Sequence, residues 1–175
     1  NYQDDPRWMI NEINAVFDSN YPVFATIGDH ENLIDKQNKK WAPGLEWPIY
    51  QADFMRRIKN SAEKADCDGD FGVNTLCHYK GIGIALSGVG SDPGNLKNYH
   101  TYIRENLGAD ASPWKICAFH RSDWDINTEV QQVAEECRRA GAIIVVGHDH
   151  AYGRTKLVDS FVNFNVVGES SPILI

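Results

Sequence analysis

The chain has 175 residues, of which 42% are hydrophobic and 23% charged, and its net charge is −7. This is the composition of one globular domain with a core of its own, so we expect residues 1–175 to form a single domain. No apolar run reaches the ~18 residues of a membrane span. The negative charge, without any basic tract, argues against nucleic acid or an anionic membrane surface as the main partner.

Strands and helices are predicted to alternate along the chain. Asp5 and Pro6 form an N-cap and first helical residue, and Trp8 and Ile13 follow at helical spacing. The further elements, in chain order, are a buried strand over 21–28, a polar loop over 31–47, a helix over 51–64, a strand over 79–88, a helix over 96–107, a strand over 114–119, a helix over 127–140, and strands over 142–147, 156–158 and 161–167. This alternation predicts an α/β or α+β fold with helices covering the sheets.

The four cysteines leave two interpretations open. Cys67 and Cys77 flank the turn-rich stretch DGDFGVNTL, which a disulfide could close. Cys117 lies on a predicted strand and Cys137 on the helix after it, so a second bridge is geometrically possible. Two bridges would indicate a secreted or extracytoplasmic protein, whereas four free thiols would indicate a reducing compartment. A cysteine zinc site is not expected, because no C-x-x-C pair is present.

Candidate metal ligands follow the predicted strands. Four of the six histidines occupy such positions: His30, His120, His148 and His150. Loops beyond strand ends gather ligands in α/β proteins, and converging imidazoles commonly bind zinc, iron or manganese. Asp29 adds an oxygen ligand. Alternate residues of an extended segment point the same way, so we expect His148 and His150 to face one cleft.

These residues carry a resemblance to a known family. The segments GDHEN (28–32), FHRS (119–122) and GHDHAYGR (147–154) resemble the third, fourth and fifth motifs of the calcineurin-like metallophosphoesterases. The chain is most similar to the secreted branch that includes the purple acid phosphatases, over about residues 2–168. The resemblance implies a four-layer sandwich of two packed mixed sheets flanked by helices. It also implies hydrolysis of a phosphate ester, by a phosphatase or phosphodiesterase that uses a metal-activated hydroxide.

The resemblance also implies a metal pair. Asp29, which stands where the family has Asn, would bind one ion together with His120 and His148. His150 would bind the other ion, with Tyr2 as a further ligand. The metals would be iron, zinc or manganese, divalent or of mixed valence. Because the chain offers few ligands for the second site, it is left open whether the chain binds one ion or two.

Two residues are assigned to the substrate. The resemblance implies that His30 protonates the leaving group or orients the phosphate. Arg154 either contacts the substrate or forms a surface ion pair. The family motifs D-x-H and G-D-x-x-[DY] do not precede Asp29, so we expect the domain to be incomplete at its N-terminus. A missing N-terminal segment or a protein partner would then cover an open sheet edge.

Three interpretations of function follow. The first is a secreted hydrolase of phosphate esters. The second is a non-catalytic relative that keeps the fold as a structural or binding subunit of a larger assembly. The third is a protein with one metal and different chemistry on its two histidines and one carboxylate.

Overall fold

The computed structural model of the chain describes residues 7–29, 31, 46–91, 98–122, 127–149 and 160–161. Within these ranges the helices are α1 (Trp8–Val16), α2 (Glu46–Asn60), α3 (Tyr99–Asn106) and α4 (Thr128–Arg139). The strands are β1 (Asp66–Asp70), β2 (Asn74–Tyr79), β3 (Ile82–Ser87), β4 (Trp114–Phe119) and β5 (Ile143–Val146). None of the described helices is long and apolar enough to cross a membrane.

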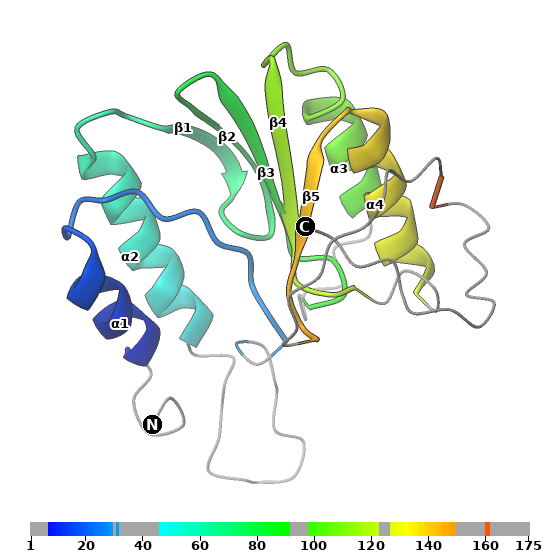
Figure 1. Ribbon diagram of the computed structural model, residues 1–175. Coiled ribbons are helices and arrows are strands. Elements are labelled where there is room, and N and C mark those ends of the chain that lie inside the picture. Colours follow the sequence, from blue (N-terminus) through cyan, green and yellow to red (C-terminus); the bar gives the residue numbers. More distant parts are fainter. Residues whose placement is uncertain are drawn as a thin grey trace, which may run out of the picture.

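The five strands form one mixed sheet in the order β1-β2-β3-β4-β5 (Figure 1). β1, β2 and β3 pair antiparallel, whereas β3, β4 and β5 pair parallel. Parallel neighbours need a crossover, and α3 and α4 lie in the two connections. The carboxyl ends of β3, β4 and β5 therefore meet at one edge of the sheet, the lower edge in Figure 1. The predicted mixture of helices with a mixed sheet is confirmed for the described part of the chain.

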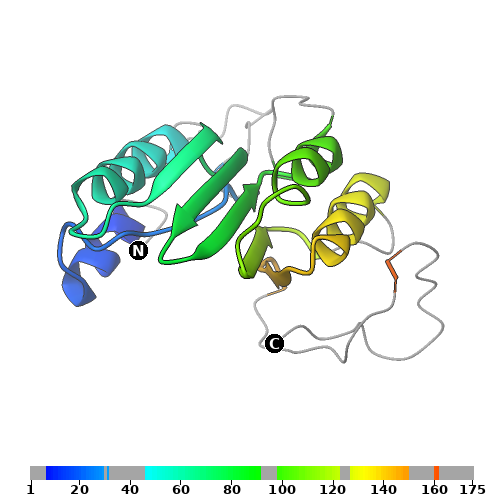
Figure 2. The same cartoon turned by 90° about the horizontal axis from the view of Figure 1, so that it is seen from above.

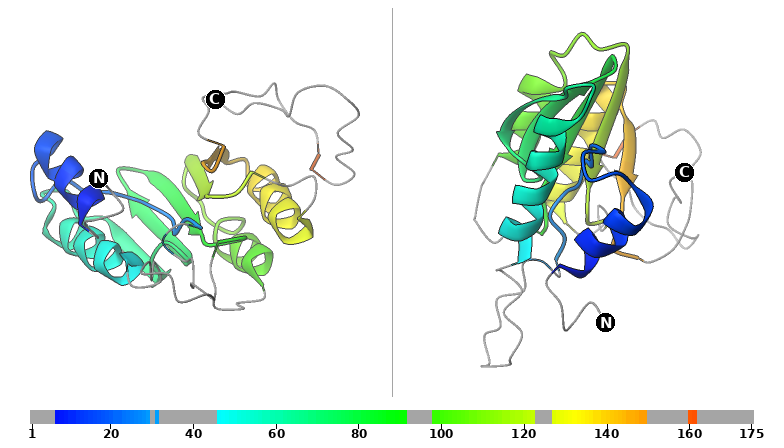
Figure 3. Two further views of the ribbon diagram at one scale, coloured as in Figure 1. Left: turned by 90° about the horizontal axis from the view of Figure 1, so that it is seen from below. Right: turned by 90° about the vertical axis from the view of Figure 1, so that its left-hand side faces the viewer.

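Helices cover the two faces of the sheet unequally (Figure 2 and Figure 3). α3 and α4 pack on one face, where a disulfide joins Cys117 of β4 to Cys137 of α4. α1 and α2 lie on the other face, where the ring of Phe24 contacts that of Tyr79 with centroids 5.6 Å apart. Because side chains alternate along a strand, β4 and β5 expose three apolar residues on this second face: Trp114, Ile143 and Val145.

Both predicted disulfides are present. Cys67 and Cys77 lie directly opposite each other in β1 and β2, so their bridge crosses the hairpin. Cys117 and Cys137 connect the centre of the sheet to α4, and both are fully buried. The alternative of four free thiols is therefore wrong.

Several elements agree with the sequence analysis. β4 occupies the predicted residues 114–119, and β5 lies within the predicted 142–147. Asn127 caps α4, since its Oδ1 accepts hydrogen bonds from the amides of Glu129 and Val130 at 3.1 and 3.3 Å. α3 lies within the predicted helix 96–107, and its residues Tyr99 and Ile103 are buried.

The prediction of a strand over residues 21–28 is wrong. The segment is extended and partly buried, but among the described residues it pairs with no strand. Ile27 donates its amide to the carbonyl of Gly72 at 3.1 Å, and Phe24 lies against Tyr79 of β2. An apolar run predicts burial, and here the burial comes from lying against a sheet face instead of pairing at its edge.

Other boundaries also differ. α1 begins at Trp8, with Arg7 at the N-cap position, later than the predicted start. α2 begins at Glu46 and ends at Asn60, earlier at both ends than the predicted helix over 51–64. The early start is possible because Pro48 lies in the first helical turn, where its missing amide would have no partner. The stretch around Cys67 and Cys77 is a hairpin and not only a loop. The predicted strand over 79–88 therefore covers the end of β2, a turn and β3.

Some expected elements lie outside the described residues. These are the strand at 156–158, the strand at 161–167 except for Phe161, the N-cap at Asp5 and Pro6, and residues 96–97 of the predicted helix.

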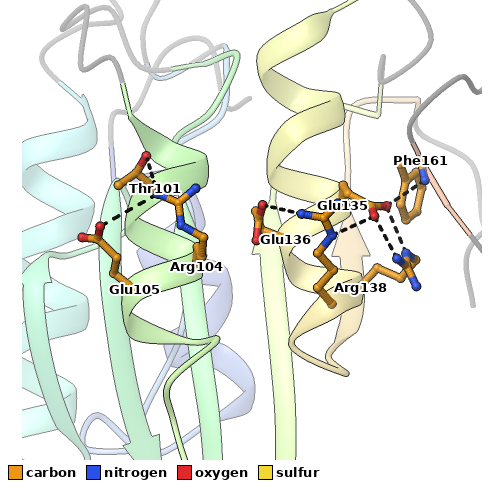
Figure 4. A network of polar contacts seen from close by, with 8 residues as sticks. Thr101, Arg104, Glu105, Glu135, Glu136, Arg138 and Phe161 are labelled. Atoms are coloured by element: carbon orange, nitrogen blue, oxygen red, sulfur yellow. Dashed lines mark hydrogen bonds and ion pairs between the residues drawn. The ribbon is translucent and has the colours of Figure 1, made fainter.

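A buried carboxylate fixes Phe161 to α4 (Figure 4). Glu135 is 5% exposed and accepts hydrogen bonds from Arg138 at 2.8 and 3.0 Å and from Arg139 at 3.0 Å. It also accepts the amide hydrogen of Phe161 at 2.9 Å. The Arg138 hydrogen bonds lower the pKa of Glu135 to about 2, against a desolvation that raises it.

We predict that Glu135→Gln makes folding stability less dependent on pH. Since the pKa of Glu135 is lower in the folded chain, its contribution is full above the unfolded-state value of 4.5 and is lost as pH falls toward 2. At pH 7 the variant should lose on the order of 2–3 kcal/mol of unfolding free energy. Below about pH 3 most of the difference from wild type should disappear. Denaturant unfolding at a series of pH values measures this.

Glu105→Gln on α3 is the matched control. Glu105 is exposed and lies 3.9 Å from Arg104, so its loss should change stability by less than about 0.5 kcal/mol. Equal pH profiles for Glu135→Gln and wild type would contradict the prediction.

Candidate metal centre

Three segments bring polar side chains to the carboxyl edge of the parallel strands. His120 directly follows β4, and His148 is the second residue after β5. Asp29 follows the extended segment 21–28, which runs to the same lower edge in Figure 1. Loops at this edge of a parallel sheet are the usual place for a ligand site.

The three side chains converge on one point. Nε2 of His120 lies 2.7 Å from Oδ1 of Asp29, and Nδ1 of His148 lies 3.4 Å from Oδ2 of Asp29. The two imidazole nitrogens are themselves 3.4 Å apart, and the rings meet edge to face with centroids at 5.2 Å. All three side chains are between 21% and 31% exposed, so a small ligand can reach them from solvent.

These separations fit a shared metal ion. Zinc binds imidazole nitrogen and carboxylate oxygen at about 2.0–2.2 Å, which places neighbouring ligand atoms roughly 3.0–3.4 Å apart. Nδ1 of His148 lies 3.4 Å both from Nε2 of His120 and from Oδ2 of Asp29, whereas the 2.7 Å contact of His120 is with the other carboxylate oxygen, Oδ1. The three donor atoms lie within 4.8 Å of one another, a set of two imidazoles and one carboxylate. Such a set suits zinc, iron or manganese.

Two glycines make room for the ring of His120. A Cβ at Gly28 would lie 3.3 Å from Nδ1 of His120, and a Cβ at Gly147 would lie at the same distance. Gly147 also donates its amide to the carbonyl of His120 at 3.0 Å. A Cβ at Gly28 would also lie 2.5 Å from Oε2 of Glu31, which accepts the amide hydrogen of Gly28 at 2.9 Å. The Nδ1 side of the ring therefore lies against two glycines, and Nε2 faces Asp29 and His148.

The backbone turns sharply at His148. Its φ is +74°, and Asp149 donates its amide to the carbonyl of Gly147 at 3.0 Å, which defines a γ-turn centred on His148. A non-glycine residue in this region costs on the order of 1–3 kcal/mol, and such residues cluster at functional sites. The hydroxyl of Ser122 donates to the carboxylate of Asp149 and so ties this turn to the loop after β4.

The extended backbone expected at the fifth motif is not found at His148, whereas the shared orientation with His150, which lies outside the described residues, stays a prediction. We expected His148 and His150 to point the same way along an extended segment. His148 is not extended, because the γ-turn reverses the chain there. The position of His148 in the site comes from this turn and not from strand alternation.

One residue near the centre was missed in the sequence analysis. Nη1 of Arg121 lies 3.8 Å from Oδ2 of Asp29, and the side chain is 29% exposed. The only sequence signal is its position directly after His120. An arginine in a loop is normally a surface residue, so this position alone did not indicate a role.

The other predicted site residues cannot be compared with the structure. Tyr2, His30, His150 and Arg154 lie outside the described residues. Their roles as metal ligands, as a proton donor and as a substrate contact remain predictions. The described residues supply the donors for one ion.

Comparison with protein-family models, curated proteins and solved structures gives no match for this chain.

We predict that His148→Ala lowers the affinity for Zn²⁺ at least about 100-fold, because it removes one of three direct ligands and the loss of a residue that only supports a ligand already costs about 10- to 100-fold. Titration against a chromophoric chelator measures the dissociation constant. His100→Ala on α3 is the control, since His100 lines a separate cavity with Gln131 and Glu136. Equal affinities in His148→Ala and wild type would rule out the site.

Proposed function

We propose that the protein is a metal-dependent hydrolase of phosphate esters. The observation that carries this proposal is the convergence of Asp29, His120 and His148 from three separate segments onto one point. Each of these residues belongs to a segment that resembles a motif of the calcineurin-like metallophosphoesterases. The order of the motifs and their place after strands support the same assignment.

The chemistry follows from the donor set. Asp29, His120 and His148 would hold a divalent ion, and the glycines beside His120 limit the direction of its Nε2. Such an ion would supply an acidified water molecule and a positive charge for the phosphoryl oxygens. In our proposal His30 protonates the leaving group, as the resemblance implies.

The proposal extends to a second metal and to a complete fold. His150 and Tyr2 would bind the second ion, giving a pair of iron, zinc or manganese ions. A second mixed sheet would complete the four-layer sandwich. Such a sheet would cover the apolar face on which β4 and β5 expose Trp114 and Val145.

We also propose that the protein is secreted or extracytoplasmic. Two disulfides are formed within the described residues. Disulfides persist mainly in oxidising compartments, which supports export.

A non-catalytic role is the second candidate. The observation that favours it is the exposed apolar surface formed by Trp114, Ile143 and Val145, because such patches commonly mark protein interfaces. In that case the protein would serve as a subunit of a larger assembly, with a partner on this face of the sheet.

Hydrolysis of 4-nitrophenyl phosphate and of its bis ester tests the proposal. After loading with Zn²⁺, Mn²⁺ or Fe²⁺, wild type should release nitrophenolate, and a chelator should abolish the reaction. His148→Ala should lose at least about 100-fold in kcat/KM, since metal binding is weakened, whereas His100→Ala should keep wild-type activity. A metal-loaded wild type that hydrolyses neither ester would contradict the proposal and favour the non-catalytic role.

A further inference from the structure

We propose that Arg121 binds the phosphoryl group of the substrate beside the metal centre, an inference that rests on the proposed hydrolysis. Arg121 follows His120 directly, so the packing that fixes the metal ligand also fixes the Cα of the arginine. Its Nη1 is 3.8 Å from Oδ2 of Asp29, which places the guanidinium at the rim of the three-ligand cluster. Because the side chain is partly exposed, a ligand entering from solvent can reach it.

The stem of Arg121 is held in place by the loop after β3. Gly90 has a φ of +75°, and a Cβ there would lie 2.8 Å from Cδ of Arg121 and 3.3 Å from its Cγ. The same Cβ would lie 3.2 Å from Cγ2 of Val130 on α4. The arginine stem therefore passes close to the backbone at Gly90, and this packing limits the positions of the guanidinium. A preorganised cation loses less freedom when it binds an anion.

The contact with Asp29 is not a hydrogen bond. At 3.8 Å, it is an ion pair beyond hydrogen-bond distance. Asp29 therefore experiences the positive charge of Arg121 at this distance. A guanidinium also suits a phosphoryl group, because its planar fork of donors matches two phosphoryl oxygens.

The charge balance of the centre also favours this role. The chain carries a net charge of −7, and Asp29 adds a carboxylate where a phosphate ester must approach the metal. A cation next to that carboxylate offsets the repulsion. Arg121 is the cation that the described residues place against Asp29.

Calorimetric titration of inorganic phosphate into the Zn²⁺-loaded 175-residue chain tests the inference. Arg121→Met removes the charge but keeps a long apolar stem. It should weaken phosphate binding roughly 10- to 100-fold, the effect of losing hydrogen bonds to a charged group. Its Zn²⁺ affinity should stay within about threefold of wild type, because Arg121 is not a metal ligand. Arg121→Lys should recover part of the phosphate affinity, since the charge remains but the fork is lost.

Two further variants complete the design. Arg104→Met on α3 makes the same charge change at an exposed residue that pairs with Glu105, and it should leave both affinities unchanged. Gly90→Ala keeps every charge but pushes the arginine stem, and it should weaken phosphate binding about threefold to tenfold. If Arg121→Met does not fold, Arg121→Lys decides the question.

The outcomes separate this inference from the proposed function. Equal phosphate affinities in wild type and Arg121→Met would overturn the role of Arg121. A loss of Zn²⁺ affinity that parallels the loss of phosphate affinity would also overturn it, because Arg121 would then act only by positioning Asp29. Either result leaves hydrolysis standing if wild type cleaves 4-nitrophenyl phosphate. If wild type binds phosphate through Arg121 but hydrolyses neither ester, the proposed hydrolysis is overturned. The role of Arg121 in binding an anion would then still stand.

Discussion

The Nδ1 edge of the His120 imidazole lies close against two glycines, and the geometry of the candidate metal centre depends on that packing. Gly28 and Gly147 approach the ring from different segments, each at a distance where a Cβ would already be in tight contact. The absence of a side chain at Gly28 and Gly147 therefore lets the loops that carry them lie close to the ring of His120. The same packing turns Nε2 of His120 toward Asp29 and His148. A site held by backbone contacts of this kind is defined before any ligand arrives.

The fold fixes the strand that carries His120 in two ways. β4 is central in the parallel part of the sheet, with β3 and β5 on its sides. Three residues before His120, Cys117 is covalently joined to Cys137 on α4 across a sequence separation of 20. Closing a loop of that length restricts the unfolded chain by about 3 kcal/mol in the chain-entropy model. β4, braced by α4, thus gives His120 a rigid support.

The sequence predicted those elements well because their signals are local. β4 and β5 are short apolar runs bounded by polar residues, and α4 has a clear cap at Asn127. The hairpin of β1 and β2 was missed, since its many polar and glycine residues are typical of a loop. Residues 21–28 were predicted as a strand because hydrophobicity reports burial and not pairing.

The candidate site could be predicted only in part for a similar reason. Asp29, His120 and His148 are of residue types that bind metals, and they follow apolar segments. The γ-turn at His148 depends on the approach of Gly147 to His120, a contact between loops that no local pattern encodes. The place of Arg121 likewise depends on the turn at Gly90, about thirty residues earlier in the chain.

Metal binding and phosphate binding place opposite demands on this centre. A carboxylate at position 29 strengthens the hold on a divalent ion but repels an anionic ester. The ion pair between Nη1 of Arg121 and Oδ2 of Asp29, at 3.8 Å, offsets part of this repulsion. An aspartate at this position is thus compatible with phosphate chemistry as long as a cation is held beside it, and the packing of Arg121 against Gly90 provides one.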